Sequence, residues 1–152
     1  MSVLIHADQL RLINLGQRVE KATGTLAATT VPLFTIAGGR VGITSIYGLV
    51  TTAITVANSY KLQSNPTTGT TQDMCTATDL GTNDTPAGAV LSMASPAAAI
   101  TGGSTTTIVA SPLTGTVILP IGQIESVSAG TDGAITWVVF WIPLDDGATL
   151  VA

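Results

Sequence analysis

The sequence predicts an all-β protein: a sandwich, jelly roll or small barrel of about eight or nine short strands, preceded by an N-terminal arm that is partly helical. Threonine occurs 26 times, and β-branched side chains suit a pleated sheet better than a helix. Only 9% of the residues are charged, against roughly 25% in ordinary soluble domains. Glycine and proline divide the chain into short apolar segments, and this spacing of turn residues is typical of sheets.

The longest apolar segment, residues 133–143, predicts a central strand. Gly133 opens it, Pro143 ends it, and β-branched and aromatic residues fill it, which favours a strand over a helix. Because side chains alternate along a strand, we expect two apolar faces. They comprise Ile135, Trp137, Val139 and Trp141 on one side and Val138, Phe140, Ile142 and Leu144 on the other. Both faces need a cover, which for one of them would be another sheet, an arm or a neighbouring subunit.

Composition divides the chain into an N-terminal arm, residues 1–24, and a single β domain, residues 25–152, long enough to bury a core. The arm follows neither a helical nor a strand period throughout, although its pattern allows a short helix from about Asp8 to Leu15. We expect the arm to pack against a partner or a neighbouring subunit. The alternative is that it forms an ordinary first element of the fold.

Within the β domain, residues 33–37 and 40–50 predict two strands joined by a hairpin turn at Gly38-Gly39, because glycine adopts positive φ without steric cost. Gly42 and Gly48 indicate a bulge or a close backbone approach. The remaining predicted strands are residues 51–57, 71–77, 89–94, 105–110, 114–119 and 124–128, with a turn at residues 65–70. Residues 60–63 either end the strand at 51–57 or begin the next one.

Charge is distributed unevenly. Residues 1–61 contain five basic and two acidic residues, a net +3, whereas residues 62–152 contain seven acids and no Lys or Arg, a net −7, and the two sum to −4. We therefore expect no nucleic-acid partner for the body, because phosphate binding needs clustered cations. The basic N-terminal end could contact an acidic partner surface, and chance among so few charges explains the asymmetry equally well.

Hydropathy and cysteine content limit the cellular compartments and the kinds of cross-link that we expect for this chain. Mean hydropathy is +0.52, but no apolar window reaches the about 20 residues of a spanning helix, so no membrane partner is expected. A signal-peptide pattern is absent from the start of the sequence, and we expect folding in a cytoplasm. The single cysteine, Cys75, excludes an internal disulfide and is expected to behave as a small apolar residue.

Catalytic, cofactor and metal sites are not expected. His6 is the only histidine and lies in the arm, where a triad or a general base lacks rigid support. Asp145 and Asp146 are adjacent, so on a strand they point to opposite faces and cannot flank one bond, and with Gly147 they form an ordinary turn signal. The other acids match no EF-hand loop, and no segment matches a phosphate loop. The sequence therefore predicts a structural or binding protein rather than an enzyme.

Turn motifs occur in three segments: Gly38-Gly39-Arg40-Val41, Asn65-Pro66-Thr67-Thr68-Gly69-Thr70 and Trp141-Ile142-Pro143-Leu144-Asp145-Asp146-Gly147-Ala148. With the Thr/Ala/Gly-rich composition, the chain from about Val19 to the end resembles small virion proteins of tailed bacteriophages, and among these the capsid decoration, or cement, proteins. The resemblance implies a homotrimer on the exterior of an icosahedral capsid, made in the host bacterial cytoplasm. It also implies that the trimer binds the major capsid protein and stabilises the shell.

Two sets of contact residues follow as hypotheses. Val138, Phe140 and Ile142 would form the oligomer interface, and Arg11, Arg18 and Lys21 would contact the shell. Three alternatives remain open. One is a fibre or host-recognition module that binds glycans, which would need an exposed aromatic platform. Another is a small hydrolase, which the single histidine disfavours. The third is another head or tail subunit, which would assemble as a ring rather than a trimer.

Overall fold

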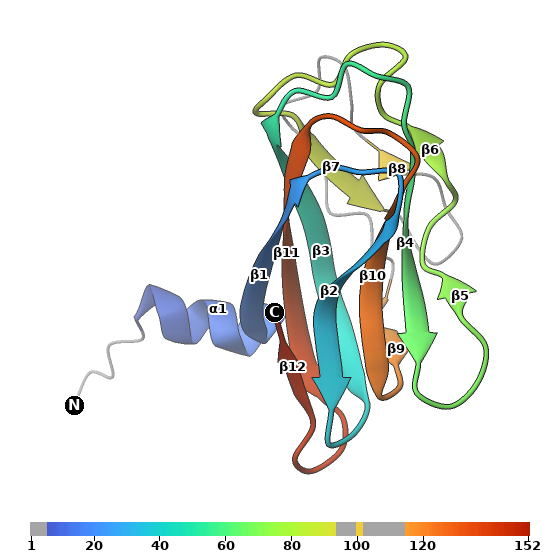
Figure 1. Ribbon diagram of the computed structural model, residues 1–152. Coiled ribbons are helices and arrows are strands. Elements are labelled where there is room, and N and C mark those ends of the chain that lie inside the picture. Colours follow the sequence, from blue (N-terminus) through green and yellow to red (C-terminus); the bar gives the residue numbers. More distant parts are fainter. Residues whose placement is uncertain (1–5, 94–99, 102–114) are drawn as a thin grey trace.

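The computed structural model describes residues 6–93, 100–101 and 115–152. In these ranges a short helix precedes strands that form two antiparallel sheets packed face to face (Figure 1). The elements are α1 (Ala7–Leu15), β1 (Gln17–Thr25), β2 (Thr30–Ala37), β3 (Val41–Thr52), β4 (Ser59–Pro66), β5 (Gln72–Asp73), β6 (Thr78–Asp79), β7 (Val90–Met93), β8 (Ile100–Thr101), β9 (Val117–Leu119), β10 (Gly122–Ser128), β11 (Ala134–Pro143) and β12 (Thr149–Val151). The predicted all-β sandwich with a partly helical arm is confirmed.

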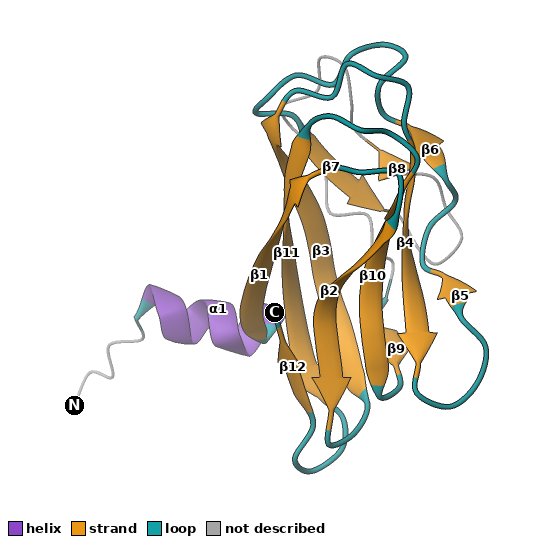
Figure 2. Cartoon of the chain, viewed as in Figure 1, coloured by secondary structure: helices purple, strands orange, loops and turns teal. Residues whose placement is uncertain are grey.

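The chain crosses repeatedly between the two sheets. Sheet A has the order β1-β11-β3-β7-β8, with β9 also pairing with β3, and sheet B has the order β12-β2-β10-β4-β5, with β6 also pairing with β4. The connections β1 to β2, β3 to β4, β9 to β10 and β11 to β12 all pass from sheet A to sheet B (Figure 2). Apart from β4 with β5 and β7 with β8, neighbouring strands are therefore not consecutive in sequence, and the core depends on long-range pairing.

Strand β11 lies inside sheet A, between the edge strand β1 and the middle strand β3. Its inward face carries Ile135, Trp137, Val139 and Trp141, none more than 4% exposed, as the predicted alternation requires. The ring of Trp137 stacks on that of Tyr60 from sheet B, with centroids 6.1 Å apart and planes 8° apart. The indole N–H donates to the Tyr60 hydroxyl at 2.8 Å. This pair joins the two sheets in the centre of the core.

Gly48 confirms the predicted close approach. It is the cross-strand partner of Trp137, and a Cβ atom at this position would lie 3.2 Å from the indole ring. The bulges in this ladder lie elsewhere, between Ala134 and Ile135 and between Phe140 and Trp141. A side chain at position 48 would therefore compete for the space that the buried tryptophan fills.

The turn at Gly38-Gly39 forms, but the predicted hairpin is wrong. Strand β2 belongs to sheet B and β3 to sheet A, so the turn carries the chain across the end of the sandwich. Gly38 has φ +74°, and a Cβ atom there would lie 2.1 Å from the Gly147 carbonyl oxygen. Close packing between two end turns, rather than strand pairing, thus requires the glycine. Local sequence indicates a chain reversal but does not specify whether the flanking strands pair.

The predicted strand at residues 51–57 is also wrong in most of its length. Strand β3 continues to Thr52, and only an isolated bridge between Ile54 and Thr85 follows. The segment is held instead by the Asp132 carboxylate, which accepts hydrogen bonds from the backbone N–H groups of Thr55 and Val56. Residues 71–77 contain only the two-residue β5, residues 105–110 lie outside the described residues, and β12 was not predicted.

The predicted arm, residues 1–24, divides into a helix and a strand. Strand β1 pairs with β11 from Gln17 opposite Trp141 to Thr25 opposite Ala134, and Val19 packs against the core. The second half of the arm therefore completes the sandwich, as in the alternative considered above. Among the described helices and strands, only α1 lies outside the two sheets (Figure 1).

Candidate interaction surfaces

Helix α1 projects sideways from the lower end of β1 (Figure 1). At its start, the backbone N–H of His6 donates to Gln9 Oε1 at 3.1 Å, an interaction that favours helix initiation. None of its residues is buried. Leu10, Leu12 and Ile13 are 52%, 54% and 73% exposed, so three large apolar side chains of this helix lie in solvent.

Gly16 fixes the point at which the helix leaves the sandwich. Its φ is +86°, and a Cβ atom there would lie 2.2 Å from the Trp141 carbonyl oxygen and 2.7 Å from Ile142 Cγ2, so glycine alone fits without rearrangement. The Thr44 hydroxyl donates to the Leu15 carbonyl. The base of α1 is therefore attached to sheet A, whereas its apolar side chains remain uncovered.

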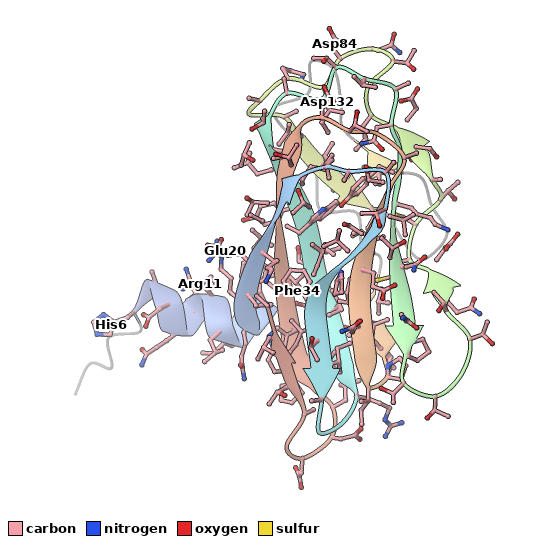
Figure 3. All side chains as sticks on the ribbon, viewed as in Figure 1. His6, Arg11, Glu20, Phe34, Asp84 and Asp132 are labelled. Carbon is pink, nitrogen blue, oxygen red and sulfur yellow. The ribbon has the colours of Figure 1, made fainter. Side chains whose placement is uncertain are left out.

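The predicted shell-contact residues do not form one patch. Arg11 is exposed on α1 and takes part in no ion pair among the described residues (Figure 3). Arg18 pairs with Glu20 on one face of β1. Lys21 lies three residues further along the strand and therefore faces the other way. The three cations are thus distributed over the helix and both faces of an edge strand.

The predicted oligomer-interface residues lie together on the outer face of sheet A, but they differ in exposure. Val138 is 4% exposed and Phe140 7% within a single chain, whereas Ile142 is 36% exposed. The directly opposite side chains belong to Arg18 and Glu20 of β1 and to Ser45 and Tyr47 of β3. The chain thus buries Val138 and Phe140 itself, and of the three predicted interface residues only Ile142 keeps substantial area for a partner.

A second exposed apolar group surrounds Gly42 of β3. In the register of sheet A, Gly42 lies between Ile142 of β11 and Ile118 of β9. A Cβ atom on Gly42 would lie 2.6 Å from Thr116 Cγ2, 3.3 Å from Ile142 and 3.5 Å from Leu144, so Ile142 and Leu144 border this glycine and Ile118 is its cross-strand partner. Ile118 is 63% exposed and Leu144 42%. We call Ile118, Ile142 and Leu144 the Gly42 patch. Sequence reasoning missed it because the pairing of β9 beside β3 carries no local signal.

The turns at the lower end of the sandwich line an open cavity of about 340 Å³. The Arg40 guanidinium donates to both Asp145 carboxylate oxygens, at 2.9 and 2.7 Å, and its backbone N–H donates to one of them at 2.7 Å. These hydrogen bonds hold the pKa of Asp145 below its usual range. The lining offers threonine hydroxyls and a matched ion pair but no histidine or cysteine that could activate a nucleophile. It consists of Gly39, Arg40, Thr67, Thr68, Pro120, Ile121 and Asp145.

Two further carboxylates hold loops rather than forming a site. The backbone N–H and hydroxyl of Thr55 both donate to Asp132 at 2.8 Å and lower its pKa. The pKa of Asp79 is lowered in the same way by the Thr82 side chain and the Gly81 backbone. Nowhere in the described part of the chain do three or more His, Cys, Asp or Glu side chains gather as they would around a metal ion.

No protein-family model, curated protein or solved structure matches this chain. The Phe, Trp and Tyr side chains all belong to described residues, and they do not form an exposed platform. Trp137 and Trp141 are buried, and Tyr47 is the one Phe, Trp or Tyr side chain that is partly exposed. His6 is exposed at the start of α1, away from the carboxylates of the loops (Figure 3). Within the described ranges, no helix has the length and apolar character that crossing a membrane requires.

Proposed function

We propose that this chain is a virion structural protein, a capsid decoration or cement protein that binds the outer surface of an icosahedral phage head as a homotrimer and stabilises it. The observation that carries the proposal is α1, whose apolar side chains Leu10, Leu12 and Ile13 face solvent beside a compact sandwich. A nine-residue helix is marginal in water on its own. A helix of this kind gains its stability by docking on another surface.

The body of the protein supports a passive structural role. In the described part of the body, Arg40 forms a surface ion pair with Asp145 and Lys61 forms one with Asp73. The Asp79 and Asp132 carboxylates accept hydrogen bonds that hold loops. Cys75 is buried, so the thiol is unavailable for surface chemistry. A rigid sandwich that presents hydroxyl-rich surface and a projecting helix is suited to contact with other proteins rather than to turnover of a substrate.

The stabilising effect follows from mass action. A protein that binds the assembled shell but not its separated subunits shifts the equilibrium towards the shell. A trimer that spans neighbouring copies of the major capsid protein adds contact area across their joints. Arg11, Arg18 and Lys21 remain the proposed contacts with an acidic or polar shell surface. Of the three, only Arg18 forms an ion pair among the described residues, with Glu20, so Arg11 and Lys21 are the more available.

The proposal is tested by titrating the purified protein onto capsids stripped of their small outer proteins, with bound copies and shell melting temperature as readouts. We expect saturation at a fixed stoichiometry, in multiples of three, and a higher melting temperature of the shell. Arg11→Ala should weaken binding several-fold at low salt, consistent with the modest strength of exposed ion pairs. Lys61→Ala, which removes the same charge from sheet B, is the matched control. Ring stoichiometry would favour a head or tail subunit instead, and a shell that neither binds the protein nor gains stability would refute the cement role.

A further inference from the structure

Two places in the described chain leave large apolar side chains in solvent as a group. They are Leu10, Leu12 and Ile13 of α1 and Ile118, Ile142 and Leu144 of the Gly42 patch. These six make up most of the ten large apolar side chains that are more than a third exposed in the described ranges, so the surface that calls for a partner is concentrated in two spots. We propose that α1 of one copy docks on the Gly42 patch of a second copy of this chain.

The helix needs support that its own chain does not supply. Isolated helices shorter than about 12 residues are marginal in water, and α1 has nine residues with none buried. Leu10 and Ile13 are three residues apart and lie on one side of the helix, whereas Leu15, on the other side, is half-buried at the base. Leu10 and Ile13 therefore form one apolar side that is free for a partner, and Leu12, which is 54% exposed, lies on the side of Leu15.

The direction of the helix excludes its own patch as the docking site. The Gly42 patch lies at the base of α1, because Ile142 is in contact distance of Gly16. From that point the helix runs away from both sheets (Figure 1), over a length of about 13 Å at 1.5 Å per residue. Leu10 and Ile13 thus lie beyond the edge of their own sandwich. Every copy has one α1 and one Gly42 patch. In a cyclic oligomer, α1 of each copy can therefore dock on the patch of the next copy, and every helix and every patch is then covered.

Charge favours an arm-to-body contact over an arm-to-arm contact. Helix α1 carries one acid, Asp8, and one base, Arg11. Arg11 has no ion-pair partner among the described residues, so its guanidinium can pair with an exposed carboxylate on the body of the neighbouring copy. Asp146 is exposed close to Leu144 in the patch. A bundle of α1 helices would instead bring the Arg11 side chains of several copies together. The inference deepens the proposed homotrimer by naming the surfaces that join its subunits, and it rests on that proposal for the number of copies.

The test is sedimentation velocity on the full chain and three single variants. Ile13→Asp removes the apolar side of the arm, and Ile118→Asp places a charge in the patch. Val151→Asp is the matched control, because Val151 is 54% exposed on β12 of the other sheet. We expect an oligomer for the wild type and for the control. The two other variants should dissociate, with association weakened roughly 30-fold or more if these residues are hot spots of the contact.

A mixing experiment decides between this contact and its alternatives. Ile13→Asp retains an intact patch and Ile118→Asp retains an intact arm, so an equimolar mixture of the two monomeric variants should form a two-chain complex. Far-ultraviolet circular dichroism and the melting temperature check that each variant is folded, and Leu144→Ser serves as a second patch variant should Ile118→Asp fail to fold. A monomeric wild type, an Ile118→Asp protein that still associates, or a mixture that stays monomeric would each overturn the inference.

Failure of this inference is distinguishable from failure of the cement role. If both variants remain trimeric and still saturate stripped shells, only the arm-to-patch contact is wrong. If the mixing experiment succeeds but the wild-type oligomer binds no shell, the contact stands and the cement role falls.

Discussion

Replacing Tyr60 by phenylalanine tests how the two sheets are joined. The Tyr60 hydroxyl accepts a hydrogen bond from the Trp137 indole at 2.8 Å, and both side chains are 0% exposed. Burial raises the pKa of Tyr60 well above its ordinary value, so the hydroxyl remains protonated and neutral. The substitution keeps the stacked ring and removes only the oxygen. Any change in stability therefore reports the hydrogen bonds of the hydroxyl, with Trp137 and with Ser126, rather than the packing.

The size of the effect follows from the burial of the donor. The indole N–H can only donate, and without the Tyr60 oxygen it has no acceptor at the centre of the core. Leaving such a group unsatisfied costs about 1–3 kcal/mol in the free energy of unfolding. For a domain of about this length, each kcal/mol corresponds to a shift of about 2–4 °C in Tm, so we expect Tyr60→Phe to lower Tm by roughly 2–12 °C.

The measurement is guanidinium unfolding followed by tryptophan fluorescence and circular dichroism, with Tm from calorimetry. Tyr47→Phe is the matched control, because Tyr47 is the other tyrosine of the chain and its side chain is only half-buried on the outer face of sheet A. The control should change stability by less than about 0.5 kcal/mol. Equal stability of Tyr60→Phe and the wild type, or an equal loss in both variants, would refute the claim that the Tyr60–Trp137 hydrogen bond contributes to joining the sheets.

Three further predictions concern the turns, the loops and the thiol. In denaturant unfolding, Gly38→Ala should destabilise the protein more than Gly24→Ala. Both glycines have positive φ, which costs about 1–2 kcal/mol for alanine. Of the two, only Gly38 would place the new Cβ against a backbone oxygen, at 2.1 Å. The backbone N–H of Thr55 lowers the folded-state pKa of Asp132. The ionised Asp132 carboxylate therefore stabilises the fold above its unfolded pKa of about 3.9, and this stabilisation is lost as pH falls through the folded value. Between neutral and strongly acidic pH, Asp132→Asn should lose less stability than the wild type. Burial raises the pKa of Cys75, so a thiol reagent at mildly alkaline pH should label it only when the protein unfolds, and rapid labelling of the folded protein would contradict this.

The strands that sequence reasoning identified are those with a strong local signal. β11 was predicted nearly to its ends because Gly133 and Pro143 bound a continuous run of β-branched and aromatic residues. The sheet to which each strand belongs has no such signal. Gly38 marks a reversal of the chain whether the next strand pairs with the last one or crosses to the other sheet, and the structure shows the crossing. Asp132 illustrates the same limit, since its partners Thr55 and Val56 are more than seventy residues away.

The contact residues were predicted with similar limits. Alternation along β11 correctly placed Val138, Phe140 and Ile142 on one face, but it could not show that opposing side chains from β1 and β3 bury the first two. Ile118 was missed because its position beside Gly42 depends on the pairing of β9 with β3. The pattern allows a short helix from about Asp8 to Leu15, and α1 begins one residue earlier. The sequence does not show which side of this helix a partner would cover, because residues 7–15 place apolar side chains on two sides.

A single feature of the backbone accounts for both exposed apolar groups. Strand β1 covers the edge of β11 up to the pair Gln17 and Trp141, and there the chain turns away at Gly16 to become α1. Ile142 is the next residue along β11 and has no β1 partner, which explains why it is 36% exposed while Phe140 is 7% exposed. The same turn therefore uncovers one side of the Gly42 patch and sends Leu10 and Ile13 outward. An arm that leaves its own sheet at this point exposes a surface of the kind that the arm of a neighbour needs, which is the relation expected of subunits that exchange helices around a closed ring.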